Sequence, residues 1–222
     1  MHGKTVYGGS WNKIYRKYKE VEDPHIIIPK SFIKLLRQKK AKMVLDLACG
    51  TGRHSIYLAK QGFKVIAVDS SSETLKILKR KIKEQAIKNI DVKKGSLSQI
   101  PLKKSSVDAI ICIKALSHGR LSDIKKYIAE MHRVCKTKGL ILTDLLSIHD
   151  PDFGKFKEIE PKTFLGLPQE EETPHYFAEK KDIKELFPGF KIISIKERKV
   201  PASKFRYEKL YSVIYQIIAL KK

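Results

Sequence analysis

Cysteine, arginine and long apolar runs are all scarce in this chain of 222 residues. Its three cysteines, Cys49, Cys112 and Cys135, are an odd number without short spacing. That pattern disfavours both a disulfide framework and a zinc site, so we expect no metal. No apolar run reaches the ~18–20 residues that cross a bilayer, and the first residues lack the apolar stretch of a secretory signal. These absences predict a cytoplasmic protein without a membrane partner.

The chain is strongly basic, with 46 lysines and arginines against 24 acidic residues and a net charge of +22. Only eight of the basic residues are arginines, whereas specific recognition of phosphates and bases relies on arginine. Widely spread lysines are also typical of a solubilising surface. Residues 147–172, by contrast, are acidic, with a net charge of −4. We therefore favour a small-molecule partner over a nucleic acid.

Short apolar runs alternate with amphipathic segments over residues 43–146, which predicts an α/β fold with a largely parallel sheet. The apolar runs 190–196 and 210–220 follow one another without a helix, so we expect these two strands to pair antiparallel. Residues 147–178 have no clear period and contain four prolines. A long stretch of that kind is typical of a lid or an insertion. We predict one domain over residues 1–222, with this insertion over the substrate site.

A glycine-containing turn follows the first predicted strand, in the segment VLDLACGTGR at residues 44–53. Small residues there let the backbone approach a ligand, and the N-terminus of the next helix offers free N–H groups. Asp69 ends the second predicted strand, where a carboxylate accepts hydrogen bonds from ribose hydroxyls. The two features together predict a nucleoside cofactor. Nicotinamide proteins need a third glycine, and this chain has Ser55 at that position.

These motifs resemble those of the class I S-adenosylmethionine-dependent methyltransferases with a type 11 or type 25 methyltransferase domain. LDLACGTG is similar to their first motif, with Ala48 in place of the first glycine. The likeness continues through Asp69, Gly95-Ser96-Leu97, the strand 107–111 and the segment EMHRVCKTKG at 130–139. It implies a Rossmann-like three-layer αβα sandwich. Its seven-stranded, mostly parallel sheet would have the order 3-2-1-4-5-7-6, with strand 7 antiparallel.

The resemblance implies S-adenosyl-L-methionine as the cofactor. Asp46 and the backbone of residues 48–52 would hold its methionine part, and Asp69 its ribose. Ser96 stands where the family usually has an aspartate beside adenine, so its hydroxyl or the local backbone would take over that contact. Residues 1–40 would form a helical cover that brings two aromatic rings over the cofactor. The implied cofactor-binding residues are Trp11, Tyr15, Asp46, Ala48, Cys49, Gly50, Gly52, Asp69, Ser70, Ser96, Leu97, Cys112 and Ile113.

Two histidines are candidates for a general base, which methyl transfer needs only when the acceptor arrives protonated. His118 lies in the loop after the fourth predicted strand, and His175 lies at the end of the acidic insertion. The loop after that strand lacks Asp/Asn-Pro-Pro-aromatic and Pro-Cys sequences, which disfavours amino-group and covalent cytosine chemistry. We therefore expect a small-molecule methyl acceptor. A tRNA, rRNA or protein methyltransferase, a nicotinamide oxidoreductase and a non-catalytic cofactor-binding protein remain alternatives, and the oligomeric state is not predicted.

Overall fold

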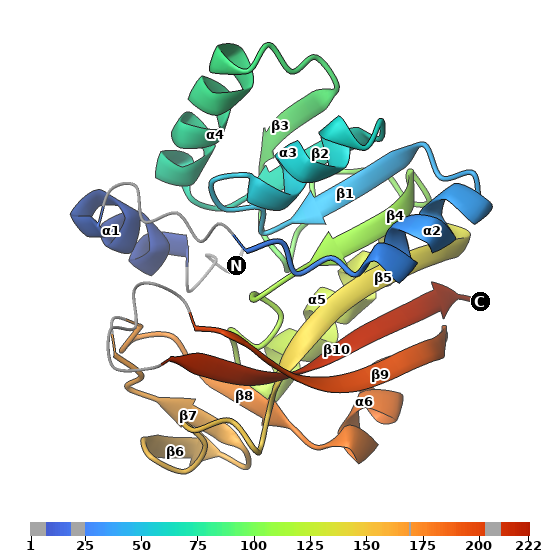
Figure 1. Cartoon of the computed structure of the whole chain (residues 1–222). Coiled ribbons are helices and arrows are strands. Elements are labelled where there is room, and N and C mark those ends of the chain that lie inside the picture. The colour runs from blue at the N-terminus through green and yellow to red at the C-terminus, as the bar shows by residue number, and fades with distance from the viewer. Residues whose placement is uncertain (1–7, 19–24, 169, 203–209) are drawn as a thin grey trace.

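The computed structural model describes residues 8–18, 25–168, 170–202 and 210–222. Strands and helices alternate over residues 43–94 and again over residues 107–147, and no helix lies between the strands at 90–94 and 107–112 (Figure 1). The helices are α1 (Gly8–Tyr18), α2 (Lys30–Gln38), α3 (Arg53–Lys60), α4 (Ser72–Glu84), α5 (Leu121–Val134) and α6 (Lys180–Leu186). The strands are β1 (Met43–Leu47), β2 (Lys64–Asp69), β3 (Ile90–Lys94), β4 (Val107–Cys112), β5 (Cys135–Ser147), β6 (Lys157–Glu160), β7 (Thr163–Leu165), β8 (His175–Ala178), β9 (Phe190–Pro201) and β10 (Tyr211–Lys221).

Ten strands of the described residues form one sheet, rather than the seven predicted. Seven of them follow one another in the order β3-β2-β1-β4-β5-β10-β9, and β8, β7 and β6 form a branch that starts at β5. Strands β1 to β5 pair in parallel, and β10 is antiparallel to both β5 and β9. This confirms the predicted order and the antiparallel seventh strand. The reversal arises because only nine residues separate β9 from β10, whereas the crossover that joins parallel neighbours needs about a dozen or more.

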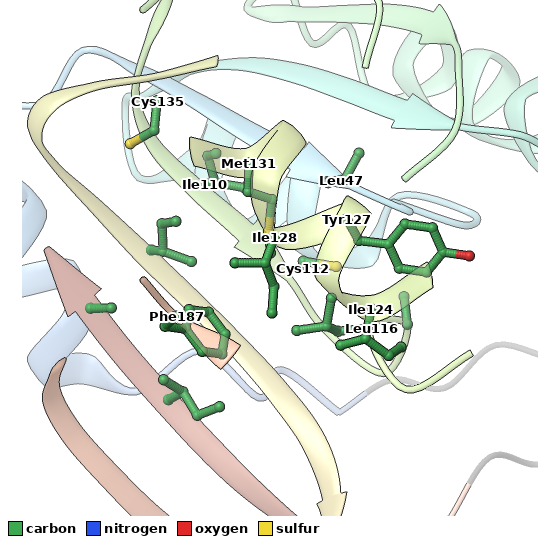
Figure 2. Close-up of a cluster of buried hydrophobic side chains, with 14 of the residues drawn as sticks. Leu47, Ile110, Cys112, Leu116, Ile124, Tyr127, Ile128, Met131, Cys135 and Phe187 are labelled. Atoms are coloured by element: carbon green, nitrogen blue, oxygen red, sulfur yellow. The ribbon is translucent and has the colours of Figure 1, made fainter. Parts of the chain in front are cut away.

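Helices cover both faces of the sheet, which gives the predicted three layers. On one face, α2 and α3 pack on alternate residues of β1, β2 and β4 through a cluster that includes Phe32, Leu36 and Leu58. On the other face, α5 and α6 pack on the intervening residues through the largest cluster. Figure 2 shows part of that cluster, with Ile124, Ile128 and Met131 of α5 directed at the strands. Alternation along each strand therefore supplies both cores.

The insertion, residues 147–178, has more regular structure than its sequence predicts. Strands β6, β7 and β8 form an antiparallel group, and β8 also pairs in parallel with the last two residues of β5. Phe164, Leu167 and Phe177 give this group a small core of its own. The strands are only three or four residues long, and β8 is buried on both faces. A run of that length shows no alternation, so the sequence pattern does not indicate it.

Two further observations concern the helices. The segment Ser70-x-x-Glu73 predicts a capping box, but the helix begins one residue later, and the Ser71 hydroxyl accepts from the Thr74 N–H at 3.3 Å. None of the helices in the described part of the chain has the length and hydropathy to cross a membrane.

Candidate functional site

The turn between β1 and α3 has an unusual backbone that small residues make accessible. Ala48 (φ 58°), Gly50 (φ 55°) and Gly52 (φ 85°) all adopt the left-handed conformation, which costs an L-residue other than glycine about 1–2 kcal/mol. A Cβ on Gly52 would stand 2.1 Å from the Leu78 side chain of α4, so only glycine fits there. Residues 48–52, called the glycine turn below, therefore bring bare backbone to the carboxyl end of the sheet.

Asp69, at the end of β2, is hydrogen-bonded to the glycine turn. Its Oδ2 atom accepts from the Gly50 N–H at 2.8 Å, and its Oδ1 atom accepts from the Ser71 N–H at 2.8 Å. Burial raises the pKa of this carboxyl group, and these two hydrogen bonds oppose that rise. Each carboxylate oxygen has a second lone pair. Asp69 can therefore fix the turn and still accept from a diol.

Asp46 of β1 lies behind the same turn and is buried. The Ser55 hydroxyl of α3 donates to its Oδ2 atom at 2.6 Å. Burial raises the pKa of Asp46 to about 7, although the Ser55 hydrogen bond and the charge of Arg53 lower it. Ser55, which stands where a nicotinamide fingerprint has its third glycine, is thus the hydrogen-bond donor to Asp46.

A cavity of about 500 Å³ lies beside the carboxyl ends of β2 and β3. Its lining residues are Ser70, Lys94, Gly95, Ser96, Gln99, Ile100, Pro101, Leu102 and Lys103. It thus lies next to Asp69 and includes two of the residues predicted to lie against adenine, Ser70 and Ser96. The Ser96 hydroxyl is 3.2 Å from the Ser98 hydroxyl, and its backbone exchanges hydrogen bonds with Gln99. The position of this cavity, next to Asp69, agrees with a purine attached to a ribose there.

Helix α1 carries two aromatic residues to the other side of the glycine turn. The Tyr15 hydroxyl lies 3.5 Å from where a Cβ on Gly50 would stand. Burial, and next the charge of Asp69, raise the pKa of Tyr15. The Trp11 ring lies 6.3 Å from the Tyr15 ring and 5.2 Å from the His118 ring, centroid to centroid. A row of three rings therefore extends from the glycine turn to His118.

The structure brings the two predicted histidines together and adds a carboxylate. His118 and His175 face each other across an isolated antiparallel bridge, with ring centroids 4.8 Å apart. The Glu170 Oε2 atom lies 2.5 Å from Nε2 of His175 and 3.4 Å from Nε2 of His118. His175 and Glu170 are buried, whereas the His118 side chain is 15% exposed. These three residues are called the His–Glu cluster below.

Asp144 of β5 is a buried carboxylate on the same side of the sheet as Asp46. Its Oδ1 atom accepts from the Lys114 N–H at 2.8 Å, whereas no described residue forms a hydrogen bond with Oδ2. Burial raises its pKa to about 6, and the nearby charges of Lys114, His118 and Arg53 lower it. A buried carboxylate oxygen in this state is available to a ligand.

The remaining residues that were predicted to bind the cofactor lie in the hydrophobic cores next to the site or in the glycine turn. Cys112 is fully buried in the cluster under α5 (Figure 2), and burial raises the pKa of its thiol. Ile113 belongs to the core on the α2 and α3 face, and Leu97 packs at the edge of the α5 core. Cys49 is buried within the glycine turn. His54 accepts a hydrogen bond from the Ile27 N–H at 3.3 Å, which agrees with a structural role.

Sequence reasoning did not single out Ser55, Asp144 or Glu170 as site residues. Glu170 is one of three consecutive glutamates and gives no local sign that it alone points inward. In the folded chain the Glu170 side chain is buried, whereas Glu171 and Glu172 are exposed. Asp144 interrupts an apolar strand, and that interruption is the one signal that could have found it.

Comparison with known proteins adds family relationships to this geometry. Residues 44–139 match the model of a methyltransferase domain family. The malonyl-[acyl-carrier protein] O-methyltransferase of Hamiltonella defensa is 26% identical over 156 residues, which are 70% of this chain and 56% of that protein. The demethylmenaquinone methyltransferase of Oceanobacillus iheyensis is 26% identical over 209 residues, 84% of this chain and 87% of that protein. The chain thus spans little more than half of the first relative and most of the second.

A solved structure shares the fold over nearly its whole length. It is a methyltransferase of Methanosarcina mazei described as S-adenosylmethionine-dependent, with a TM-score of 0.75 and 20% identity. The alignment covers 88% of this chain and 99% of that one.

Proposed function

Since this chain carries a methyltransferase domain of the class I, S-adenosylmethionine-dependent kind, we propose that it methylates a small molecule with S-adenosyl-L-methionine as the methyl donor. The observation that carries this proposal is the hydrogen bond between the glycine turn and Asp69, next to a cavity that Ser70 and Ser96 line. A nicotinamide oxidoreductase is not supported, because Ser55 occupies the third glycine position and bonds to Asp46.

The cofactor, when bound, supplies a reactive methyl group on a sulfonium ion. The chain's own residues bind and orient it. The glycine turn offers close backbone approach, Asp69 has lone pairs for the ribose hydroxyls, and Ser70 and Ser96 line the purine cavity. Trp11 and Tyr15 cover the opposite side of the turn and exclude water from it. Asp46 lies behind the turn, in the place predicted for the methionine part.

The acceptor approaches from the side of the insertion, where β5 and β8 end. In open α/β sheets, ligands bind at the carboxyl ends of the strands. The insertion is acidic on a basic chain, and negative charge there repels a phosphate backbone. The names of the two relatives, which refer to malonyl-[acyl-carrier protein] and demethylmenaquinone, agree with a non-polynucleotide acceptor. We therefore favour a small molecule over RNA and treat the insertion as its lid.

The His–Glu cluster is the polar centre that acts on the acceptor. His118 is its most exposed member and contacts Trp11, which connects it to the cofactor side. Glu170 holds both histidines and stabilises positive charge on either ring. This arrangement supports the predicted roles of His118 and His175. The three free, buried cysteines agree with a reducing compartment such as the cytoplasm.

The test is a methyl-transfer assay with radiolabelled S-adenosylmethionine against total RNA, total protein and a metabolite extract in parallel. We expect label in the metabolite fraction, and incorporation into RNA that falls steeply with salt would instead favour the basic surface as the binding site. Calorimetry with S-adenosylhomocysteine and NAD tests the cofactor separately. Tight binding of NAD without binding of S-adenosylhomocysteine would overturn the proposal.

A further inference from the structure

We propose that His118, Glu170 and His175 form a site for one divalent transition-metal ion, with Zn²⁺ as the representative ion. These three residues each offer one ligand atom, and the three atoms lie close enough together to hold one ion. Two histidines and one glutamate are a ligand set of catalytic zinc sites, which keep a further position open. Spacing arguments missed this site because they considered only the cysteines.

The distances fit a shared ion. Ligand atoms at about 2.0–2.2 Å from a tetrahedral ion are about 3.3–3.6 Å apart. Nε2 of His118 and Oε2 of Glu170 are separated by 3.4 Å, and all three ligand atoms lie within 4.8 Å of one another. The His175–Glu170 pair, at 2.5 Å, has to open by about 1 Å to admit the ion.

The surroundings of the cluster orient its ligands. Nδ1 of His175 lies 2.8 Å from the carbonyl oxygen of Thr173, which can only accept, so that nitrogen carries the proton and Nε2 faces Glu170. Metal-binding histidines are commonly oriented by such a contact on the other nitrogen. Two backbone hydrogen bonds, Gly119 N–H to Pro174 O and Tyr176 N–H to Ser117 O, join the loop of His118 to β8. The ligands are therefore held before any ion arrives.

A second observation points to a ligand on this side of the sheet. The buried Oδ2 atom of Asp144 has no hydrogen-bond partner among the described residues, and its Oδ1 atom accepts from the Lys114 N–H, four residues before His118. A carboxylate in that place offsets the positive charge of an ion and of a sulfonium group. His118 also lies against Trp11, whose neighbour Tyr15 reaches the glycine turn. The ion site would thus lie beside the methyl-donor site.

The chemistry of such an ion restricts the chemical class of methyl acceptor. This extension rests on the proposed function. Three protein ligands leave at least one position for an atom of the acceptor. A hydroxyl or thiol that occupies it releases its proton to solvent more readily, so with the ion bound the two histidines act as ligands in place of general bases. The site therefore selects an acceptor with a hydroxyl or thiol group over one with a protonated amine, which has no lone pair for the ion.

The experiment measures metal binding directly and independently of methyl transfer. The full chain, treated with a chelator and dialysed, is titrated with Zn²⁺ by calorimetry and with Co²⁺ by visible absorption. We expect one ion per chain and the intense absorption of tetrahedral Co²⁺. Glu170→Gln and His118→Ala should each weaken Zn²⁺ binding by more than about 100-fold, because loss of a ligand costs more than loss of an outer-shell contact. Glu172→Gln, an exposed neighbour of the cluster, is the matched control and should bind as the parent chain does.

Circular dichroism and S-adenosylhomocysteine binding show whether each variant is folded, and His118→Ala is the safer variant because His118 is the least buried ligand. Equal Zn²⁺ affinity in the parent chain and both variants, or no binding by the folded parent chain, would overturn the metal site. Zn²⁺ binding without S-adenosylhomocysteine binding would support the metal site and overturn the proposed function. The two failures are therefore distinguishable.

Discussion

The Ser55 hydroxyl donates a 2.6 Å hydrogen bond to the buried carboxylate of Asp46. The pair joins the start of α3 to the centre of β1, directly behind the glycine turn. One hydrogen bond offsets only part of the cost of burying the carboxylate, since the pKa of Asp46 remains raised to about 7. Asp46 therefore makes the stability of the cofactor-free protein depend on pH.

The first prediction follows from that raised pKa. Between pH 4 and pH 7, the folded state holds a proton on Asp46 that the unfolded state releases. The contribution of Asp46 to stability is thus present at low pH and is lost as pH rises towards 7. Asp46→Asn does not ionise, so its free energy of unfolding relative to the parent chain should rise from pH 5 to pH 8 by about 1–3 kcal/mol.

Urea denaturation of the cofactor-free proteins at the two pH values checks this difference. Asp91→Asn, at an exposed position on β3, is the control, and its difference from the parent chain should stay constant. A constant difference for Asp46→Asn as well would show that Asp46 is ionised at no cost in the folded protein.

Replacing Asp69 should weaken cofactor binding and should also destabilise the glycine turn. Asp69→Ala removes the acceptor for the Gly50 and Ser71 N–H groups and for the ribose hydroxyls. We expect a loss of about 1.5–3 kcal/mol in S-adenosylhomocysteine binding and about 1–2 kcal/mol in the stability of the cofactor-free chain. Calorimetry and urea denaturation measure the two effects, with Glu84→Gln on the exposed face of α4 as control. Unchanged affinity would mean that another group binds the ribose.

Ser96→Asp should strengthen binding of the cofactor. Ser96 lines the purine cavity, and a carboxylate accepts from the adenine amino group more strongly than a hydroxyl does. We expect a gain of about 1 kcal/mol for S-adenosylhomocysteine. Ser98→Asp adds the same charge at an exposed position two residues away and should have a smaller effect. Equal gains in the two variants would assign the effect to overall charge.

Ala48→Gly should stabilise the cofactor-free chain. Ala48 has a φ of 58°, and the cost of this conformation to alanine exceeds the backbone entropy that glycine loses on folding. The expected gain in the free energy of unfolding is about 0.5–1 kcal/mol. Ala59→Gly, the same change inside α3, should lower stability by about 1 kcal/mol. A loss of stability in Ala48→Gly would show that the side chain of Ala48 contributes more packing energy than the strain costs.

Sequence alone determined the features that depend on short segments of the chain. The glycine turn, the acidic residue that ends β2 and the alternation of strands and helices are local patterns, and the strand order follows from them through the family resemblance. Small residues at one strand end and a carboxylate at the next predict a nucleoside cofactor, and the family resemblance specifies it as S-adenosylmethionine.

Tertiary structure alone decided which polar residues meet. His118, Glu170 and His175 come together because β8 pairs with the end of β5 and with the loop that follows β4, and no local pattern records pairing between distant segments. The same pairing buries Glu170 and leaves Glu171 and Glu172 exposed, although the three are identical in sequence terms. Asp46 and Ser55 are only nine residues apart, and they meet because α3 packs back on the strand that precedes it.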